Sequence, residues 1–417
     1  MVGGSGAQNF FAKKRNEGSV RQPSNGTAAG LSFDGRTMPT LPTPPTGEPQ
    51  FESAPQNGTP LEHALLERLR LQTKPPGSLG VLEEIGLRLG RLQGTTHPRA
   101  EIFRMCVFAG SHGIAERGVS AYPTEVTAQM IGNFLAGGAA INVLTRAAGA
   151  SLHVVDTGVD FGPQAGASSK EGPQPPAGTR FFPRSARSGT RCFSKGPAMS
   201  PDECETALAA GHEQVQLALA DAVDVLGIGE MGIGNTTSAA ALCAALLPAP
   251  AEAVVGRGTG VDASRFSRKV AVVKEALQTH TPKEPGQDHT RHWLQCVGGY
   301  EIAAMTGCIL AAAEAGLPLL VDGFIASAAA LVALRMNASA LNCCFFAHES
   351  AEAGHPLLLN ALGAAPLLRL GMRLGEGTGA AMAFPLLRAA ARLLSEMATF
   401  ESAGVSTALP TAGSIPG

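Results

Sequence analysis

The sequence is poor in charged and aromatic residues. Of its 417 residues, 16% are charged and 5% are aromatic, with one tryptophan, and the formal net charge is −2. A charge so close to neutral supplies no basic surface, which excludes nucleic acid as an expected partner. The chain is instead rich in glycine and 44% hydrophobic. This composition is typical of an α/β enzyme with closely packed helices and a large core.

Two further patterns are missing. The eight cysteines form no C-x-x-C pair, so the sequence has neither a zinc knuckle nor a thioredoxin motif, and we expect reduced, buried thiols. The most apolar stretch, residues 302–334, is interrupted by Glu314 and Asp322, which excludes a membrane span there. We expect a soluble protein, cytoplasmic unless its N-terminus directs it to an organelle.

Both ends of the chain are predicted to lie outside the folded part. Residues 1–57 are rich in glycine, serine, proline and asparagine, with four basic side chains and one acidic side chain among the first thirty. Such a segment is equally typical of a disordered, solvated extension and of an organellar transit peptide. Residues 405–417 are predicted to be a disordered tail.

Amphipathic stripes mark helices at both ends of the remaining sequence. Thr59, Pro60 and Glu62 form a capping-box start before a leucine stripe, and a second stripe follows the Lys74-Pro75-Pro76-Gly77-Ser78 segment. A third leucine stripe lies near the C-terminus. We predict that residues 58–100 and 385–404 form one small helical domain, and that residues 101–384 form a large α/β catalytic domain.

The large domain alternates apolar runs with helical segments. Runs at residues 105–109, 152–155, 223–228, 318–321 and 343–347 have the length of buried parallel strands. Polar or glycine residues follow each run: Gly110-Ser111-His112, Asp156-Thr157-Gly158, Gly229-Glu230, Asp322-Gly323 and His348-Glu349. Ordinary turns explain any one of them, but five together predict a shared cleft at the C-terminal edge of a Rossmann-like parallel sheet. Residues 160–200 and 281–291 are predicted to be exposed loops.

Residues 225–238 carry four glycines between a strand and a helix start. Gly232 and Gly234 precede Asn235, Thr236 and Thr237, where helical N–H groups favour an anion, so the loop is predicted to bind phosphate. A tight turn without a ligand is the simpler alternative.

The same loop also matches a dinucleotide fingerprint. Gly227, Gly229 and Gly232 have G-x-G-x-x-G spacing, and Glu252 lies twenty residues further on. However, Glu252 does not end a strand, and Glu230 inside the loop would repel a pyrophosphate. A nicotinamide-dependent dehydrogenase is therefore only the competing hypothesis.

Glu376 stands between Gly375 and Gly377 before a helical segment that begins near Thr378. Flanking glycines let a ligand lie against the carboxylate, and an apolar wall would raise its pKa toward that of a general base. The alternative is a solvated glutamate at a helix end.

Two other segments carry candidate binding residues. Tyr122, Gln129 and Met130 have side chains that can frame a flat aromatic ligand. The Gly256–Gly260 segment with Lys269 downstream suits a phosphate or carboxylate.

His348, Glu352 and His355 have helical spacing, at offsets of four and seven. Two histidines and a carboxylate can hold zinc, but the spacing is not H-E-x-x-H. We favour supporting or subunit-contact roles, and we expect neither a metal nor a cofactor.

Several segments in one order resemble the nicotinate-nucleotide dimethylbenzimidazole phosphoribosyltransferase family. They are K-P-P-G-S-L-G at Lys74, G-S-H-G-I at Gly110, V-S-A-Y-P-x-E-V-T-A-Q-M at Val119, G-E-M-G-I-G-N-T-T at Gly229, G-R-G-T-G at Gly256, V-D-G-F at Val321, H-E-S-A-E-x-G-H at His348 and L-G-E-G-T-G-A-A at Leu374. The chain departs from the family at Gly189-Thr190-Arg191-Cys192, where the family has Gly-Thr-x-Asn.

The resemblance implies a homodimer that acts on nicotinate mononucleotide and dimethylbenzimidazole, in making or remodelling the lower-ligand nucleotide of cobalamin. It also implies Glu376 as general base and Glu230 as a second active-site carboxylate. A nucleotide-binding protein without turnover is the non-enzymatic alternative. Residues expected to bind substrate are His112, Tyr122, Gln129, Gly232, Gly234, Asn235, Thr236, Thr237, Gly258, Lys269, Asp322, Gly375, Gly377 and Thr378.

Overall fold

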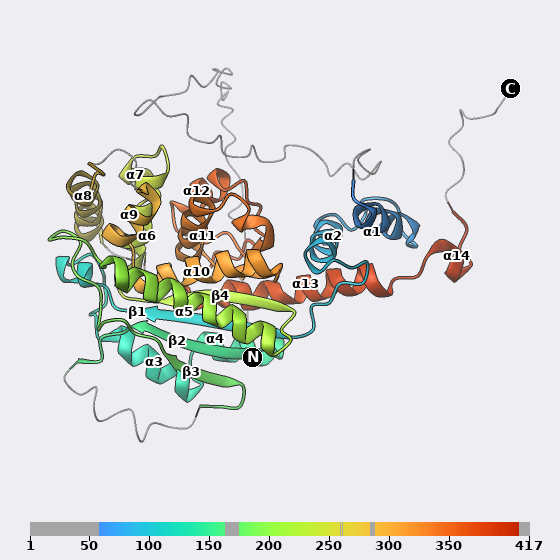
Figure 1. Ribbon diagram of the computed structural model, residues 1–417, viewed down its shortest axis with the longest axis horizontal. Coiled ribbons are helices and arrows are strands. Elements are labelled where there is room, and N and C mark those ends of the chain that lie inside the picture. The colour runs from blue at the N-terminus through green and yellow to red at the C-terminus, as the bar shows by residue number, and fades with distance from the viewer. Residues whose placement is uncertain (1–57, 163–174, 259, 261, 284–287, 408–417) are drawn as a thin grey trace, which may run out of the picture. The chain divides into compact units, whose positions relative to one another are not determined.

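The computed structural model describes residues 58–162, 175–258, 260, 262–283 and 288–407 (Figure 1). Its centre is a six-stranded sheet in the order β3-β2-β1-β4-β5-β6, in which every neighbouring pair is parallel. The strands are β1 Phe103–Gly110, β2 Ser151–Gly158, β3 Thr179–Pro183, β4 Val225–Met231, β5 Leu319–Val321 and β6 Cys344–Phe346. This confirms the predicted α/β class with a Rossmann-like parallel sheet.

Helices cover both faces of the sheet. In β1, Met105 and Val107 belong to one apolar cluster and Cys106 and Phe108 to the other, because successive side chains point to opposite faces. One face packs against α3 Val126–Ala136, α4 Ala140–Ala148 and α13 Thr378–Glu396. The other packs against α5 Pro201–Ala220, α10 Tyr300–Ala315 and α11 Phe324–Met336. Two covered faces explain why the strands are apolar runs.

The remaining helices lie around these layers and at the ends of the described chain. They are α1 Pro60–Leu71, α2 Val81–Gln93, η1 Gly113–Arg117, α6 Asn235–Leu246, α7 Ala251–Val254, α8 Ala263–Thr279, α9 His289–Val297, η3 Ala340–Cys343, α12 His355–Ala361 and α14 Phe400–Ala403. All eight cysteines are buried and free, as expected. Among the described residues, no helix combines the length and the apolar character needed to cross a membrane.

The N-terminal helices pack on the end of α13. The Thr59 hydroxyl and the Glu62 carboxylate form the predicted capping box of α1. Leu65, Leu87 and Leu394 then form a small cluster between α1, α2 and α13. Helix α13 runs unbroken through Pro385, across the boundary proposed between the small and large domains, so that division stays a prediction.

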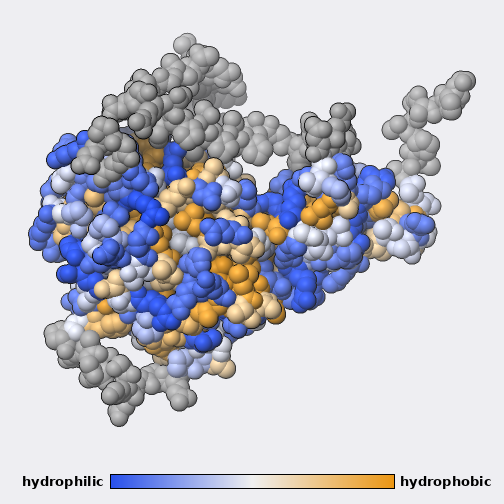
Figure 2. Space-filling view, viewed as in Figure 1, coloured by the Kyte–Doolittle hydropathy of each residue, from blue (hydrophilic) through white to orange (hydrophobic). Residues whose placement is uncertain are grey.

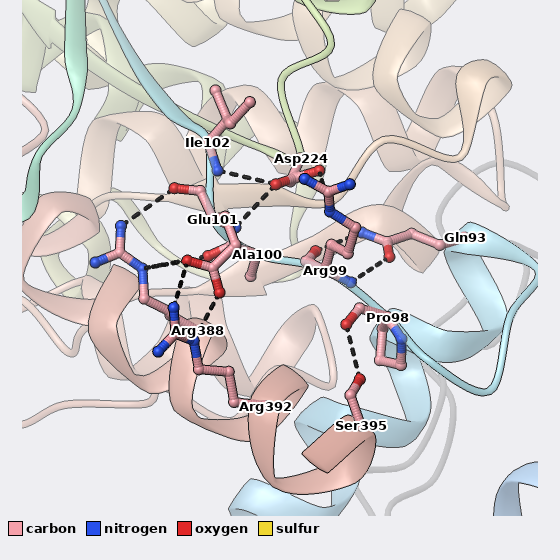
Figure 3. Close-up of polar contacts among 10 residues, drawn as sticks. All are labelled: Gln93, Pro98, Arg99, Ala100, Glu101, Ile102, Asp224, Arg388, Arg392 and Ser395. Atoms are coloured by element: carbon pink, nitrogen blue, oxygen red, sulfur yellow. Dashed lines mark hydrogen bonds and ion pairs between the residues drawn. The ribbon is translucent and has the colours of Figure 1, made fainter.

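The connection from α2 to β1 is held by charged side chains (Figure 3). Asp224, just before β4, accepts hydrogen bonds from the backbone of Glu101 at 2.8 Å and of Ile102 at 2.9 Å. Arg392 of α13 pairs with the Glu101 carboxylate at 2.7 Å, and the Ser395 hydroxyl donates to the Pro98 carbonyl at 3.1 Å. These contacts fix α13 against the first strand, which bears on the site because α13 begins two residues after Glu376.

Two of the predicted loops contain regular structure. The predicted loop at 160–200 contains the edge strand β3, so it is not loop throughout. The predicted loop at 281–291 ends early, because α9 starts at His289. The expectations for residues 1–57 and for residues 408–417 of the C-terminal tail lie outside the described residues.

Candidate active site

The predicted cleft exists at the C-terminal edge of the sheet. The strand order changes direction between β1 and β4, and in such folds the ligand crevice lies at that point. A cavity of about 540 Å³ opens beside it. Its lining comprises Tyr122, Val126, Met130, Glu230, Met231, Gly232, Ile233, Asn235, Thr236, Gly258, Asp322, Gly323, Phe324, Ile325, Ser350, Glu352, Arg373, Leu374, Gly375 and Glu376.

The five strand ends contribute unequally to this cavity. Those of β4 and β5 reach it directly through Glu230 and Asp322, and the segment after β6 reaches it through Ser350 and Glu352. The end of β2 does not, because Asp156 turns back to accept hydrogen bonds from the backbone of Gly158 and Val159. The cleft is therefore formed by the ends of fewer strands than the sequence predicted.

The glycine loop forms one wall of the cavity and the floor of a smaller pocket. Gly234 adopts a left-handed conformation, with φ of +101°, and α6 begins at the next residue without a side-chain cap. Asn235 and Thr236 line the large cavity and also an adjoining pocket of about 40 Å³, which Gly234 and Lys269 border. Thr237 is fully buried behind the loop.

Lys269 brings a buried cation to that smaller pocket. Its Nζ donates to Thr236 Oγ1 at 2.8 Å and to the Gly256 carbonyl at 3.2 Å, and the residue is 1% exposed. Burial lowers the pKa of Lys269 to about 8. Gly258, at φ of +54°, borders both pockets, and its N–H donates to Glu352 Oε2 at 3.2 Å.

The glycines of the dinucleotide fingerprint are required by packing within the protein. A Cβ on Gly229 would lie 2.1 Å from the backbone nitrogen of Gly377, and one on Gly227 would lie 2.8 Å from the Met105 sulfur. Glu252 lies in α7 and forms an exposed ion pair with Lys274. The structure therefore does not support a dinucleotide site built on these residues.

Glu230 is a buried carboxylate at the end of β4. The Asn235 side-chain amide donates to its Oε2, and the residue is 6% exposed. Burial, with the neighbouring carboxylates of Glu301 and Asp322, raises the pKa of Glu230 well above its usual value.

Glu376 sits in a strained turn immediately before α13. Its φ is +61°, and those of Gly375 and Gly377 are +85° and +82°. The Glu376 N–H donates to the Glu230 carbonyl at 3.1 Å, while Thr378 Oγ1 donates to the Gly375 carbonyl at 2.8 Å. Left-handed conformations are unfavourable for residues with a side chain, so the surroundings hold this one in place.

The carboxylate of Glu376 has the environment expected of a base. The residue is 5% exposed and lines the cavity, and its Oε2 has no hydrogen-bond partner among the described residues. Burial raises the pKa of Glu376, while the backbone N–H of Ile141 acts in the opposite direction. A carboxylate with a raised pKa that lines a cavity is suited to accept a proton from a ligand.

Asp322 lies beside Glu376, but its oxygens are already engaged. Oδ1 accepts from the backbone N–H groups of Gly379 and Ala380, at 2.7 and 3.1 Å, and Oδ2 accepts from Gly377 at 3.1 Å. Burial raises the pKa of Asp322 to about 7, against these three donors, which favour the anion.

His112 lies behind the glycine loop rather than in the cavity. Its Nδ1 is 3.0 Å from Ser238 Oγ, and its Nε2 is 2.5 Å from Glu301 Oε1. A Cβ on Gly232 would lie 3.2 Å from the His112 ring, so the histidine packs directly against the glycine loop. No local pattern in the sequence pointed to Glu301, which lies 189 residues away from its partner.

Apolar side chains line the same cavity as the carboxylates. Tyr122 and Met130 are among them, whereas Gln129 is exposed and is not part of the lining. Phe324 and Ile325, at the start of α11, belong to the same lining, and Arg373 lies at the same cavity. No pattern in the sequence pointed to these three residues, because two lie on a helix whose apolar pattern is typical of core and the third is a single exposed arginine.

The segment from His348 to His355 is not the helix that the spacing suggested. His348 bridges to Leu368 in extended conformation, and α12 begins only at His355. Ser350 donates its N–H to His355 Nδ1 at 2.8 Å. Within the described ranges, no three His, Cys, Asp or Glu side chains are grouped as metal ligands.

The chain matches known proteins over most of its length. A family model described as phosphoribosyltransferase matches residues 55–405. The nicotinate-nucleotide–dimethylbenzimidazole phosphoribosyltransferase of Azotobacter vinelandii is 50% identical over 344 residues, which cover 82% of this chain and 93% of the relative. That of Cupriavidus necator is 48% identical over 84% of this chain and 98% of the relative. The crystal structure of CobT from Thermus thermophilus matches with a TM-score of 0.76 and 47% identity, covering 84% of this chain and 99% of that one.

Proposed function

Since the chain belongs to the nicotinate-nucleotide–dimethylbenzimidazole phosphoribosyltransferase family, we propose that the 540 Å³ cavity is where it performs this transfer. The enzyme moves the ribose 5-phosphate of nicotinate mononucleotide onto dimethylbenzimidazole. The products are α-ribazole phosphate and nicotinate, and the former supplies the lower-ligand nucleotide of cobalamin. The observation that carries the site assignment is the strained, buried Glu376 beside the cavity.

The departure of nicotinate from the ribose requires little catalytic assistance from the protein. Nicotinate mononucleotide carries a pyridinium nitrogen on C1 of the ribose, so breaking the C–N bond leaves a neutral ring nitrogen. No general acid and no Lewis acid are needed for that departure. One nitrogen of dimethylbenzimidazole attacks from the opposite face, which inverts the β linkage to α. Turnover should therefore persist in the presence of a strong metal chelator.

The attacking base must lose its N–H proton, and we assign that proton to Glu376. The raised pKa and the unengaged Oε2 suit a carboxylate that becomes protonated during attack. Glu230 is assigned as the second carboxylate, placed to orient substrate beside Glu376. With both acids close together and buried, one of them can hold a proton while the other is charged.

The phosphate is assigned to the start of α6. Gly232, Gly234, Asn235 and Thr236 border the small pocket there, and Lys269 adds a positive charge 2.8 Å from Thr236 Oγ1. A helix start with a nearby lysine is a favourable site for a phosphate anion. Dimethylbenzimidazole is assigned to the apolar wall of Tyr122, Met130 and Phe324.

A turnover assay tests this assignment directly. Pure protein is incubated with nicotinate mononucleotide and dimethylbenzimidazole, and free nicotinate is measured over time. Release that depends on both substrates supports the proposal. Binding without release would favour the nucleotide-binding alternative, and the absence of both would refute the site assignment.

We also propose a homodimer. Large apolar side chains are exposed on the described surface, including Val81, Leu374 and Met382, at 56%, 58% and 41%. Figure 2 shows apolar surface gathered in the middle of one face, and a second copy can cover such surface. A sedimentation run that shows only monomer at micromolar concentration would contradict this proposal.

A further inference from the structure

Asp322 joins the end of the sheet to the start of α13. It follows β5 and is 2% exposed, and its two oxygens accept the backbone N–H groups of Gly377, Gly379 and Ala380. Three hydrogen bonds to one carboxylate engage both oxygens before any ligand arrives. The expected role of Asp322 as a substrate ligand therefore has little support in these contacts.

These three N–H groups belong to residues that closely follow Glu376 in the chain. Gly377 directly follows Glu376, whose left-handed backbone is unfavourable for a residue with a side chain. A turn of this kind relaxes unless contacts on both sides hold it. The Glu230 carbonyl holds the Glu376 N–H, and Asp322 holds the next residue along the chain.

Asp322 is itself held in position. His348 Nε2 lies 3.7 Å from its Oδ1, and a Cβ on Gly379 would lie 2.0 Å from the His348 ring. A Cβ on Gly377 would lie 2.1 Å from the terminal carbon of Met105. The turn thus has little room to move between β1, Asp322 and His348.

We propose that Asp322 is a positioning residue for the base: it fixes the left-handed turn that directs the Glu376 carboxylate to the cavity. This inference rests on the proposed role of Glu376 as general base. It assigns Asp322 no contact with substrate, so removing its interactions should slow the chemical step and leave substrate binding intact.

The first test compares Asp322→Asn and Asp322→Glu in two backgrounds, the natural chain and the Glu376→Gln variant. Asparagine offers an N–H₂ where one oxygen accepts, and glutamate shifts both oxygens by a methylene. In the natural background, each should lower kcat by roughly tenfold to a hundredfold, since a displacement of about 1 Å at a reacting group has costs of this size. KM for nicotinate mononucleotide should not change.

In the Glu376→Gln background, the same substitutions should lower single-turnover nicotinate release no further. A residue that acts only through Glu376 has nothing left to position once the base is gone, so the two effects do not add. A residue with a general structural role would reduce release in both backgrounds.

The pH profile gives a second readout. The acidic and basic groups around this turn are Glu230 from β4, Asp322 from β5, Glu301 from α10 and His348 after β6. The negative charge of Asp322 contributes to the raised pKa of Glu376. Because burial raises the pKa of Asp322 itself to about 7, this charge is present mainly above that pH. Asp322→Asn removes the charge, so the pH profile of kcat should lose the contribution that Asp322 makes near pH 7, whereas Asp322→Glu keeps a titrating carboxylate and should retain it.

The outcomes separate the two proposals. A raised KM with unchanged kcat, or equal losses in both backgrounds, would overturn the role of Asp322. Near-normal turnover of Glu376→Gln alone would instead overturn the assignment of the base. Should Asp322→Asn fail to fold, Asp322→Glu carries the same comparison, with thermal unfolding and nicotinate mononucleotide binding as checks on its integrity.

Discussion

Two helices begin at glycine turns beside the same cavity, and the N–H groups at their starts are used differently. Helix α6 follows Gly234 and has no side-chain cap, and Lys269 stands nearby. Helix α13 follows Gly377, and the carboxylate of Asp322 already accepts its first N–H groups. A helix start whose backbone N–H groups meet no carboxylate favours an anionic ligand, whereas one whose N–H groups a carboxylate accepts is neutralised.

This difference divides the work of the site. The α6 turn is suited to hold a phosphate, and the α13 turn is suited to hold a catalytic carboxylate whose own backbone must not move. The two segments look alike as sequence, since each has glycines, a glutamate and threonine. What separates them is an aspartate from another strand, which a local pattern cannot show.

The largest effect is expected at the α13 turn. Glu376→Gln keeps the shape of the side chain and removes the proposed base, so turnover should fall by roughly a hundredfold to ten-thousandfold, the usual range for loss of general-base catalysis. Nicotinate mononucleotide should still bind, because its phosphate is assigned to the α6 turn. Steady-state nicotinate release and calorimetric binding measure the two effects.

Glu230→Gln is the matched control, because it also removes a buried carboxylate from the same cavity. Replacing a residue that only orients substrate should lower kcat less than replacing the base does. An equal or larger loss of kcat in Glu230→Gln would exchange the roles of the two acids. Near-normal turnover of Glu376→Gln would show that the α13 turn does not hold the base.

The second largest effect is expected on the binding of nicotinate mononucleotide, after a change beside the α6 turn. Lys269→Met removes the buried ammonium, and the loss of a charge-assisted hydrogen bond corresponds to roughly a tenfold to hundredfold weaker Kd for nicotinate mononucleotide. Calorimetry of the natural chain and the variant checks this, with kcat at saturation expected to change far less.

The pH dependence of binding has a definite sign. The pKa of Lys269 is about 8, so its charge is present below that pH and is lost above it. Affinity for the nucleotide should therefore fall as pH rises through about 8, and Lys269→Met should lack this fall. A variant with the same pH dependence would place the phosphate elsewhere.

The fold was well predicted because buried parallel strands leave a strong local signal in the sequence. The five predicted runs all overlap strands of the sheet. The strand β3 was missed because it lies at the sheet edge, where most of its side chains are exposed and form no apolar run. The 348–355 segment was wrongly interpreted as helical because its spacing fits a helix, although the chain there continues from β6.

The site was predictable where function depends on adjacent residues. Glu376 between two glycines and the Gly232–Asn235 loop stand out in the sequence, and the structure brings both to one cavity. Glu301 and the contacts of Asp322 did not stand out, since each partner lies far along the chain. Such pairs are visible only after the fold has brought the elements together.

A smaller effect, on stability, tests whether the α13 turn is as tightly held as proposed. In Gly229→Ala the new Cβ would lie 2.1 Å from the Gly377 nitrogen, and overpacking of this kind costs about 1–3 kcal/mol in the free energy of unfolding. The control is Gly132→Ala on α3, where nothing lies within 4 Å of the new Cβ and helix propensity favours alanine by about 1 kcal/mol. The unfolding temperature should fall in Gly229→Ala and rise in Gly132→Ala. Equal shifts in the two variants would show that the turn accommodates the added methyl group at little cost.

The smallest effect is expected at Glu252, the acid that a dinucleotide site would require. Its carboxylate, on α7, forms an exposed pair with Lys274 and is not part of the cavity lining. Exposed ion pairs of this kind contribute only about 0–1 kcal/mol, so Glu252→Gln should leave nicotinate release unchanged and thermal unfolding nearly so. The natural chain should also bind NAD poorly, because Gly227 and Gly229 pack against protein atoms instead of an open cradle. Tight NAD binding that Glu252→Gln weakens would restore the dehydrogenase hypothesis and give the α6 turn a different ligand.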